Sequence, residues 1–235
     1  GGQVFRPRPI DKAIAEMESI DNNRLFIVDN SLAQDTQWEM DLFREMIPLK
    51  KKWCSHPIED NAEVLDLAAQ AGAWYVYQAV FDTSDHIRDR IRRYHDHGIL
   101  VEGTILLGLD HHTEDYIQRL VDFLLEIDLD LAEFTVLTPF PHTQAFEDLT
   151  KQDRIFSHNW NDYSADRVVY HPKHMSPERL QELFYDAWDT FYADESQQMK
   201  MFKVLQKVVE REKEDNTFRP RNRELAKQAF GRKSG

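Results

Sequence analysis

The feature that most constrains the fold is an alternation of short apolar runs and amphipathic stretches along the first two thirds of the chain. Five runs rich in β-branched and aromatic residues are expected as strands, at residues 24–30, 52–56, 74–80, 99–108 and 131–137. Stretches with helical periodicity separate them, at residues 10–20, 36–47, 61–71, 84–97 and 114–127. Strands that alternate with helices in this way predict right-handed βαβ units and a parallel sheet, and hence an α/β fold.

Polar residues within the last two expected strands favour a barrel over a doubly wound sheet. Glu102 and Thr104 share one face of a strand because they are two residues apart, and Glu133 and Thr135 share a face of the next. A carboxylate in the middle of a buried strand is costly unless it is paired or hydrated, which a polar lumen would allow. The alternative is that both strands have a solvent-facing side. We predict a partial parallel (β/α) barrel with five strands visible.

The last third of the chain has a different character. Residues 153–170 are rich in Asn, Asp, Ser, His and aromatic residues and are expected to form a structured loop. Ser176 and Pro177 are suited to the N-cap and first position of a helix that runs to about residue 192. A charged helical stretch over residues 197–214 follows. We therefore predict a partial barrel over residues 1–150 and a loop-rich, helical C-terminal extension over residues 151–235.

The charge of the chain argues against two classes of partner. Its formal net charge of −13 would repel nucleic acid and anionic membranes. Two basic runs, Lys50–Lys52 and Arg219–Arg223, are interpreted as solvated surface segments. No apolar run approaches the roughly 20 residues that span a bilayer, and the polar start shows no signal peptide. A cytoplasmic protein is expected, with no nucleic-acid or membrane partner.

The chain has one cysteine, Cys54, so neither an internal disulfide nor a three-cysteine metal site is possible within it. In its apolar strand Cys54 is interpreted as a buried, inert thiol. The histidine pairs at 95/97 and 111/112 have no recognised metal-ligand spacing and are interpreted as surface residues. No metal ligand is predicted.

Polar residues follow the expected strands at the end where parallel α/β proteins bind ligands. This set is suited to hydrogen-bonding a nucleoside or an amino acid, but each member could equally cap a turn, and both explanations stay open. The set comprises Asp29, Asn30, Ser55, His56, Gln78, Asp82, Ser84, Gly108, Asp110 and Thr138.

The order of several short segments is more specific. The series RPRPIDKAIAEME, FIVDN, IPLKKKW, YHDHGILVEGTILLGLDHHTED and LTPFPHT resembles radical S-adenosylmethionine (SAM) proteins that carry an N-terminal cobalamin-binding domain. The segment WNDYSADRVVYHPKHMSPERLQELFYDAWDTFY is similar to the region after the barrel in that family. The resemblance covers about residues 3–192.

In that family a CxxxCxxC loop after the first strand holds a [4Fe–4S] cluster, and SAM binds the fourth iron. The present chain begins at the stretch that follows this loop. The resemblance therefore implies that the cobalamin-binding domain, the first strand and the cluster loop lie upstream. Because this chain lacks the cluster ligands, it is expected to be inactive alone.

The resemblance also implies a SAM site at the carboxyl ends of the strands. Asp29 and Asn30 would contact the amino group of SAM, and residues 78–84 stand where a stretch binds its ribose and carboxylate, although the family's Glu is absent there. The run from Gly103 to Asp110 is similar to the adenine-contacting strand, and residues 138–141 would close the barrel. The expected cofactor-binding residues are Asp29, Asn30, His56, Gln78, Asp82, Ser84, Gly103, Gly108, Asp110 and Thr138.

Three functional hypotheses follow. The first is a portion of a radical SAM enzyme, a cobalamin-dependent methyltransferase or oxidoreductase that acts on a small molecule. The second is a degenerate, non-catalytic barrel that acts as a binding or scaffold module, which the departure at residues 78–84 favours. The third is a cofactor-free lyase or isomerase that uses Glu102 and Glu133 as acid and base.

Overall fold

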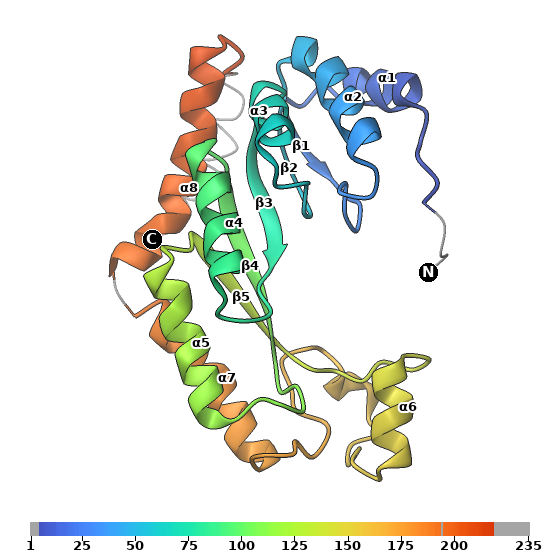
Figure 1. Ribbon diagram of the computed structural model, residues 1–235, viewed down its shortest axis with the longest axis vertical. Helices are drawn as coiled ribbons and strands as arrows, with labels where there is room; N and C mark the ends of the chain where they lie inside the picture. The colour runs from blue at the N-terminus through green and yellow to red at the C-terminus, as the bar shows by residue number, and fades with distance from the viewer. Residues whose placement is uncertain (1–4, 194, 219–235) are drawn as a thin grey trace, which may run out of the picture. The chain divides into compact units, whose positions relative to one another are not determined.

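The computed structural model describes residues 5–193 and 195–218 (Figure 1). The five strands form one parallel sheet in the order β1-β2-β3-β4-β5, which confirms the predicted α/β class. The strands are β1 Arg24–Ile27, β2 Lys52–Ser55, β3 Ala73–Ala79, β4 Leu100–Leu107 and β5 Leu131–Val136. The helices are α1 Ile10–Ser19, α2 Thr36–Met46, α3 Ala62–Gln70, α4 Asp85–Asp96, α5 Glu114–Glu126, α6 Gln144–Lys151, α7 Pro177–Phe191 and α8 Glu195–Glu214, with short 3-10 turns η1 Ile47–Leu49 and η2 Trp160–Asp162.

The helix starts follow from local capping chemistry. The side chains of Asn61, Thr113 and Ser176 each accept a hydrogen bond from a backbone N–H in the first turn of α3, α5 and α7. Helix α6, which the sequence did not predict, begins in the same way at Thr143. Helix α2 ends at Met46, before Pro48 as expected, and Pro48 lies in η1, where a proline near the start of a 3-10 turn needs no N–H donor.

The chain divides into two compact units, which are described separately. Of the described residues, unit 1 comprises 5–76, 97–99 and 202–218, and unit 2 comprises 77–96, 100–193 and 195–201. The boundary at residue 150 between a barrel and an extension stays a prediction. The basic run Arg219–Arg223 lies outside the described residues.

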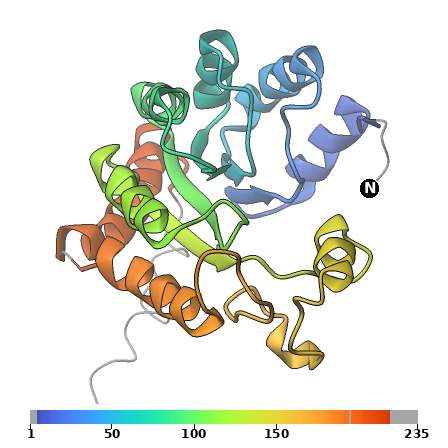
Figure 2. The same ribbon diagram turned by 60° about the horizontal axis from the view of Figure 1, so that its bottom comes forward.

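In unit 1 the core is built around Trp53 of β2. Its ring stacks on Phe43 of α2, with centroids 5.1 Å apart, and its indole N–H donates to the carbonyl of Ala71 at 3.1 Å. Helix α2 contacts both α1 and α3 (Figure 2). Lys52 precedes Trp53 and is only 4% exposed, so its interpretation as a solvated residue was wrong. Burial is possible because its ammonium pairs with the carboxylate of Asp215, which is distant in sequence.

The end of α8 joins strands of unit 1 through buried polar contacts. Arg24 of β1 forms two hydrogen bonds to the fully buried carboxylate of Glu212. The guanidinium of Arg211 donates to the carbonyls of Ala73 and Gly98, the latter at 3.0 Å. Gly98 has a φ of +68°, and a Cβ there would come within 2.8 Å of the Arg211 guanidinium. These contacts link the C-terminal part of the described chain to its first strands.

In unit 2 the pairing of β4 with β5 places Thr104 opposite Glu133. One face of these strands is buried, and its Phe134 contacts Trp188 and Phe191 of α7, which lies beside α5 (Figures 1 and 2). Glu102 and Thr104 lie on the opposite face of β4 from the buried side chains, as the spacing predicted. Glu102 is half-buried and Glu133 is exposed. Their catalytic role stays a prediction.

Candidate functional site

In unit 1, polar residues follow β1 and β2 as expected. Asp29 and Asn30 are both exposed, and a carboxylate oxygen of Asp29 accepts the N–H of Asn30 at 2.8 Å. His56 is half-buried after β2, with its ring 6.0 Å from that of Phe26. A pocket of about 560 Å³, which Asp29 helps to line, opens beside β1 among residues of α1 and α2. Asp29 and Phe26 both line this pocket, so the end of β1 borders a ligand-sized space.

A buried carboxyl group supports the loop that follows β2. Glu39 of α2 has no exposed surface, and its carboxyl group accepts the N–H of Glu59 at 3.2 Å. Burial raises the pKa of Glu39 to about 7. The same loop is also held by the N–H of Leu32, which donates to the carbonyl of Pro57 at 3.0 Å. Sequence reasoning missed Glu39, because an acidic residue in an amphipathic helix normally faces solvent.

In unit 2, the predicted residues after β3 interact mainly with their own turn. Gln78 is buried and donates to the carbonyl of Ala79 at 3.0 Å. Asp82 is exposed and accepts the N–H of Ser84 at 2.9 Å, and hydrogen bonds from Ser84 lower its pKa. The hydroxyl of Ser84 accepts a long hydrogen bond of 3.4 Å from Ile87 at the start of α4. The capping roles that were left open for Asp82 and Ser84 are therefore present in the structure.

The end of β4 is joined to the segment that leads into α7. Gly108 has a φ of +88°, and its carbonyl accepts a hydrogen bond from the hydroxyl of Tyr170. Asp110 forms ion pairs with Arg154 at 2.8 Å and Lys173 at 2.6 Å, and these two cations lower its pKa. Asp110 is thus committed to partners within the chain.

Two further predicted residues have structural roles. A Cβ at Gly103 would come within 2.6 Å of Leu129, so glycine is needed there for packing on the buried face of β4. Thr138 is buried after β5, and its hydroxyl donates to the carbonyl of Val136 at 3.1 Å.

His112 corrects the interpretation of the histidines as surface residues. It is only 2% exposed, and its ring stacks on Tyr116 with centroids 4.7 Å apart. Neither ring nitrogen has a hydrogen-bond partner within the part of the chain that the structure describes. Burial lowers the pKa of His112 to about 4, with a smaller contribution from His111. The imidazole is neutral at pH 7 and offers one donor and one acceptor.

The aromatic pair of His112 and Tyr116 connects the ends of two strands. The hydroxyl of Tyr116 donates to the carbonyl of Phe81 after β3 at 3.2 Å, while His112 follows β4. Burial, followed by the nearby charge of Asp82, raises the pKa of Tyr116. Within unit 2 the ends of β3 and β4 therefore present an exposed carboxylate and a buried neutral imidazole in one neighbourhood.

His95 and His97 are also half-buried rather than on the surface. His95 lies beside Asp130, and His97 lies beside Asp66.

Among residues 5–193 and 195–218, no group of three or more His, Cys, Asp or Glu side chains is placed to hold a metal ion. Cys54 is half-buried rather than fully buried, with its sulfur 3.7 Å from the carbonyl oxygen of Leu25.

None of the helices in the described residues has the length and apolar character needed to cross a membrane.

No family model matches the chain, but individual proteins are similar to it. The chain is 26% identical over 206 residues to bacteriochlorophyllide d C-12(1)-methyltransferase of Chlorobaculum tepidum. This alignment covers 78% of the chain and 45% of that protein. The chain is also 21% identical over 213 residues to anaerobic magnesium-protoporphyrin IX monomethyl ester cyclase of Cereibacter sphaeroides. This alignment covers 80% of the chain and 34% of that protein. The chain thus spans less than half the length of these relatives.

Solved structures show the same fold. The radical SAM methyltransferase TsrM of Kitasatospora setae, with tryptophan substrate and a SAM analogue bound, matches with a TM-score of 0.61 at 17% identity. That match covers 80% of the chain and 47% of TsrM. TsrM with cobalamin and a [4Fe–4S] cluster bound matches with a TM-score of 0.56 at 18% identity, over 62% of the chain and 32% of TsrM. The chain therefore has the same α/β fold as this radical SAM methyltransferase.

Proposed function

We propose that this chain is the SAM-binding portion of a cobalamin-dependent radical SAM enzyme, either a methyltransferase or an oxidoreductase. The observation that carries the proposal is that one methyltransferase and one cyclase each match about four fifths of the chain. Support for the cofactors comes from TsrM, which has the same fold and binds cobalamin, a [4Fe–4S] cluster and a SAM analogue. The substrate is proposed to be a small molecule with a conjugated ring, as in the names of these proteins.

The residues at the strand ends of unit 2 fit the adenosine part of SAM. The buried imidazole of His112 has two unsatisfied ring nitrogens, and a buried polar group without a partner costs about 1–3 kcal/mol. The edge of an adenine ring offers a donor and an acceptor, and one of these would satisfy one of the two imidazole nitrogens. The exposed carboxylate of Asp82 is of the type that binds ribose hydroxyl groups. We propose that the adenosine part of SAM is held here, at the ends of β3 and β4 in unit 2.

The residues of this chain do not fit a [4Fe–4S] cluster. The sequence contains one cysteine, and three thiolates are required. We propose that the cluster cysteines and a cobalamin-binding domain are encoded upstream of residue 1, and that this chain alone does not cleave SAM. Electron transfer and radical formation are therefore not assigned to any residue of this chain.

Calorimetric titration of the chain with SAM tests the proposal. The change His112→Phe keeps an aromatic ring but removes both nitrogens, so the dissociation constant for SAM should rise about tenfold, the effect of roughly one hydrogen bond. The matched control is His111→Phe at the neighbouring exposed position, which should leave the affinity unchanged. Absence of SAM binding to the folded wild-type chain at concentrations of about 1 mM would contradict the proposal.

A non-catalytic binding module is the second candidate, and one observation favours it. Asp82 and Ser84, at the position where the family binds SAM, are hydrogen-bonded within their own turn. This candidate predicts that the full-length protein neither binds SAM nor assembles a cluster after anaerobic treatment with iron and sulfide. A brown, SAM-cleaving preparation of the full-length protein would exclude it.

A further inference from the structure

Residues 155–170 form a loop, here called the aromatic loop, whose two ends are joined. Ile155 and Tyr170 form an antiparallel bridge. On either side of it, the N–H of Phe156 donates to the carbonyl of Val169 at 3.1 Å, and the N–H of His171 donates to the carbonyl of Arg154 at 2.8 Å. The intervening residues are therefore closed into a compact loop rather than an open connection.

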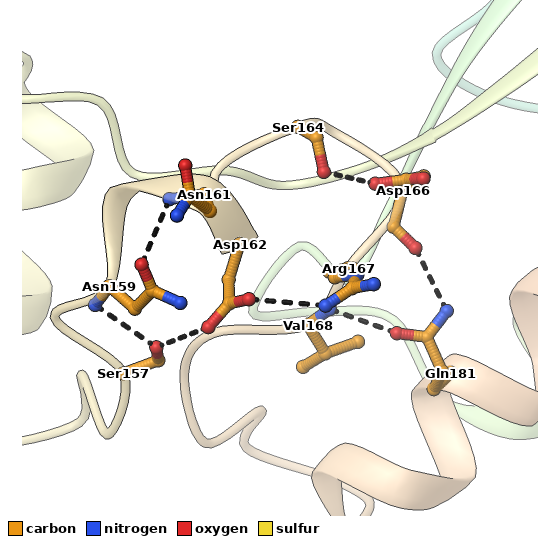
Figure 3. A network of polar contacts seen from close by, with 9 residues as sticks. All are labelled: Ser157, Asn159, Asn161, Asp162, Ser164, Asp166, Arg167, Val168 and Gln181. Carbon is orange, nitrogen blue, oxygen red and sulfur yellow. Dashed lines mark hydrogen bonds and ion pairs between the residues drawn. The ribbon is translucent and has the colours of Figure 1, made fainter.

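Polar contacts fix the inside of this loop (Figure 3). The carboxylate of Asp162 accepts hydrogen bonds from Ser157 at 2.8 Å and from Arg167 at 3.1 Å. The side-chain amide of Gln181, on α7, accepts from the N–H of Val168 at 3.0 Å and donates to the carbonyl of Asp166 at 2.9 Å. Such a network gives the loop one backbone conformation, so its side chains project in defined directions.

The aromatic loop lies at the carboxyl ends of β4 and β5. Tyr170 donates to the carbonyl of Gly108, which follows β4 directly. The N–H of Val136, the last residue of β5, donates to the carbonyl of Ala165 at 2.7 Å. The loop is thus attached to the end of the sheet at which ligands of parallel α/β proteins bind.

Two large aromatic side chains of this loop remain exposed. Phe156 is 48% exposed and Trp160 is 57% exposed, although each contacts one neighbouring ring, His171 at 5.2 Å and Tyr163 at 4.9 Å between centroids. The hydrogen bonds described above prevent the backbone from turning them inward. Exposed aromatic rings on a rigid support are suited to stacking against a flat ligand.

The charge of this region also differs from that of the chain. Residues 152–175 contain three Asp and three Arg or Lys, and also His158, His171 and His174, which are all exposed. The segment is electrically balanced, whereas the whole chain has a net charge of −13. Arg154 and Lys173 pair with Asp110 outside this segment, and with Asp110 included the region has a net charge of only −1, so a ligand that carries carboxylates is repelled weakly here.

We infer that the aromatic loop docks a planar tetrapyrrole with carboxylate side chains, which stacks on Phe156 and Trp160. This inference rests on the proposed function, because it names the substrate class for that reaction. The relatives named for bacteriochlorophyllide and magnesium-protoporphyrin cover 78% and 80% of the chain, so the loop lies within a chain related to tetrapyrrole enzymes.

Titration of the chain with zinc protoporphyrin IX tests the inference, with the Soret absorption band as the readout. The wild-type chain should bind one equivalent with a shifted band. Trp160→Ala and Phe156→Ala should each weaken binding about tenfold, because each removes one stacking partner. The control is Tyr185→Ala on α7, a side chain that is 56% exposed and lies outside the loop; it should change the affinity less than twofold.

Three outcomes would overturn the inference: no saturable porphyrin binding, equal affinity of both loop variants and wild type, or binding of free tryptophan that is lost in Trp160→Ala while porphyrin binding persists. Circular dichroism verifies that each variant is folded. SAM affinity measured on the same samples separates the two proposals. Intact SAM binding without porphyrin binding rejects only the docking loop, whereas porphyrin binding without SAM binding rejects the proposed function.

Discussion

The guanidinium of Arg24 forms two hydrogen bonds of 2.8 Å to the carboxylate of Glu212, 188 residues later in the chain. The Glu212 side chain is completely buried, whereas that of Arg24 is 30% exposed. A buried carboxylate is tolerated when its charge is matched in this bidentate geometry. The stability of unit 1 therefore depends on this pair.

Arg24→Met is expected to lower the free energy of unfolding by about 3 kcal/mol, because it leaves the buried carboxylate of Glu212 unpaired. Urea denaturation followed by circular dichroism measures the change. The control is Asp41→Asn, which removes the ion pair with Arg44 on the surface of α2 and should cost less than about 1 kcal/mol. Equal losses in the two variants would show that the Glu212 carboxylate does not need its partner.

Glu39 is expected to make the chain less stable as the pH rises. The folded-state pKa is about 7, above the usual 4.5, so the folded state holds a proton that the unfolded state has released. Stability is lost between about pH 4.5 and 7, by an amount on the order of 3 kcal/mol. Glu39→Gln should flatten this dependence and be more stable than wild type at pH 8. The same series with Glu63→Gln, an exposed residue of α3, should follow the wild type.

His112 should have the opposite effect at lower pH. Its folded-state pKa is about 4, below the usual 6.5, so the unfolded state takes up a proton first as the solution is acidified. Stability from the neutral, buried ring is lost as the pH falls from about 6.5 to about 4. His112→Phe should remove this loss, which denaturation at pH 5 and pH 7 measures. A wild-type-like decline in the variant would mean that the acid sensitivity arises elsewhere.

Gln181 should control the order of the aromatic loop without controlling the fold. Gln181→Met keeps the side-chain length but removes both hydrogen bonds to the loop, at Val168 and Asp166. Amide hydrogen exchange at Val168 should accelerate by about tenfold, in line with the loss of one hydrogen bond of about 1 kcal/mol. Asp189→Asn, at an exposed position of the same helix, should leave that exchange rate unchanged.

Local signals predicted most of the secondary structure. The five strands and the helices between them follow from period and capping, and the order of motifs indicated the radical SAM fold that the solved structures share. Helix α6 was missed because it has only eight residues, so its apolar period extends over little more than two turns.

Tertiary contacts decided what local patterns could not. Lys52 is buried because Asp215 arrives from the other end of the chain, and no local pattern reports such a partner. His112 is buried although its neighbour His111 is exposed, and the two rings are nearly perpendicular, with an angle of 89° between their planes. Glu39 has its raised pKa for the same kind of reason, since its environment comes from the loop at Glu59. Sequence reasoning therefore identified the polar residues that follow the strands but not the buried titratable groups near them, and the SAM site itself stays a prediction.

The contacts between α8 and the first strands also determine the order in which the chain can fold during synthesis. Unit 2 is almost continuous in sequence and is fully synthesised once residue 201 has been added. Unit 1 needs a segment that begins at residue 202, so Arg24 remains without its partner until Glu212 has left the ribosome. The usual order, in which the earlier part of a chain folds first, is therefore reversed here. Unit 2 can fold before unit 1, and β1 obtains its last contacts only after unit 2 has been synthesised.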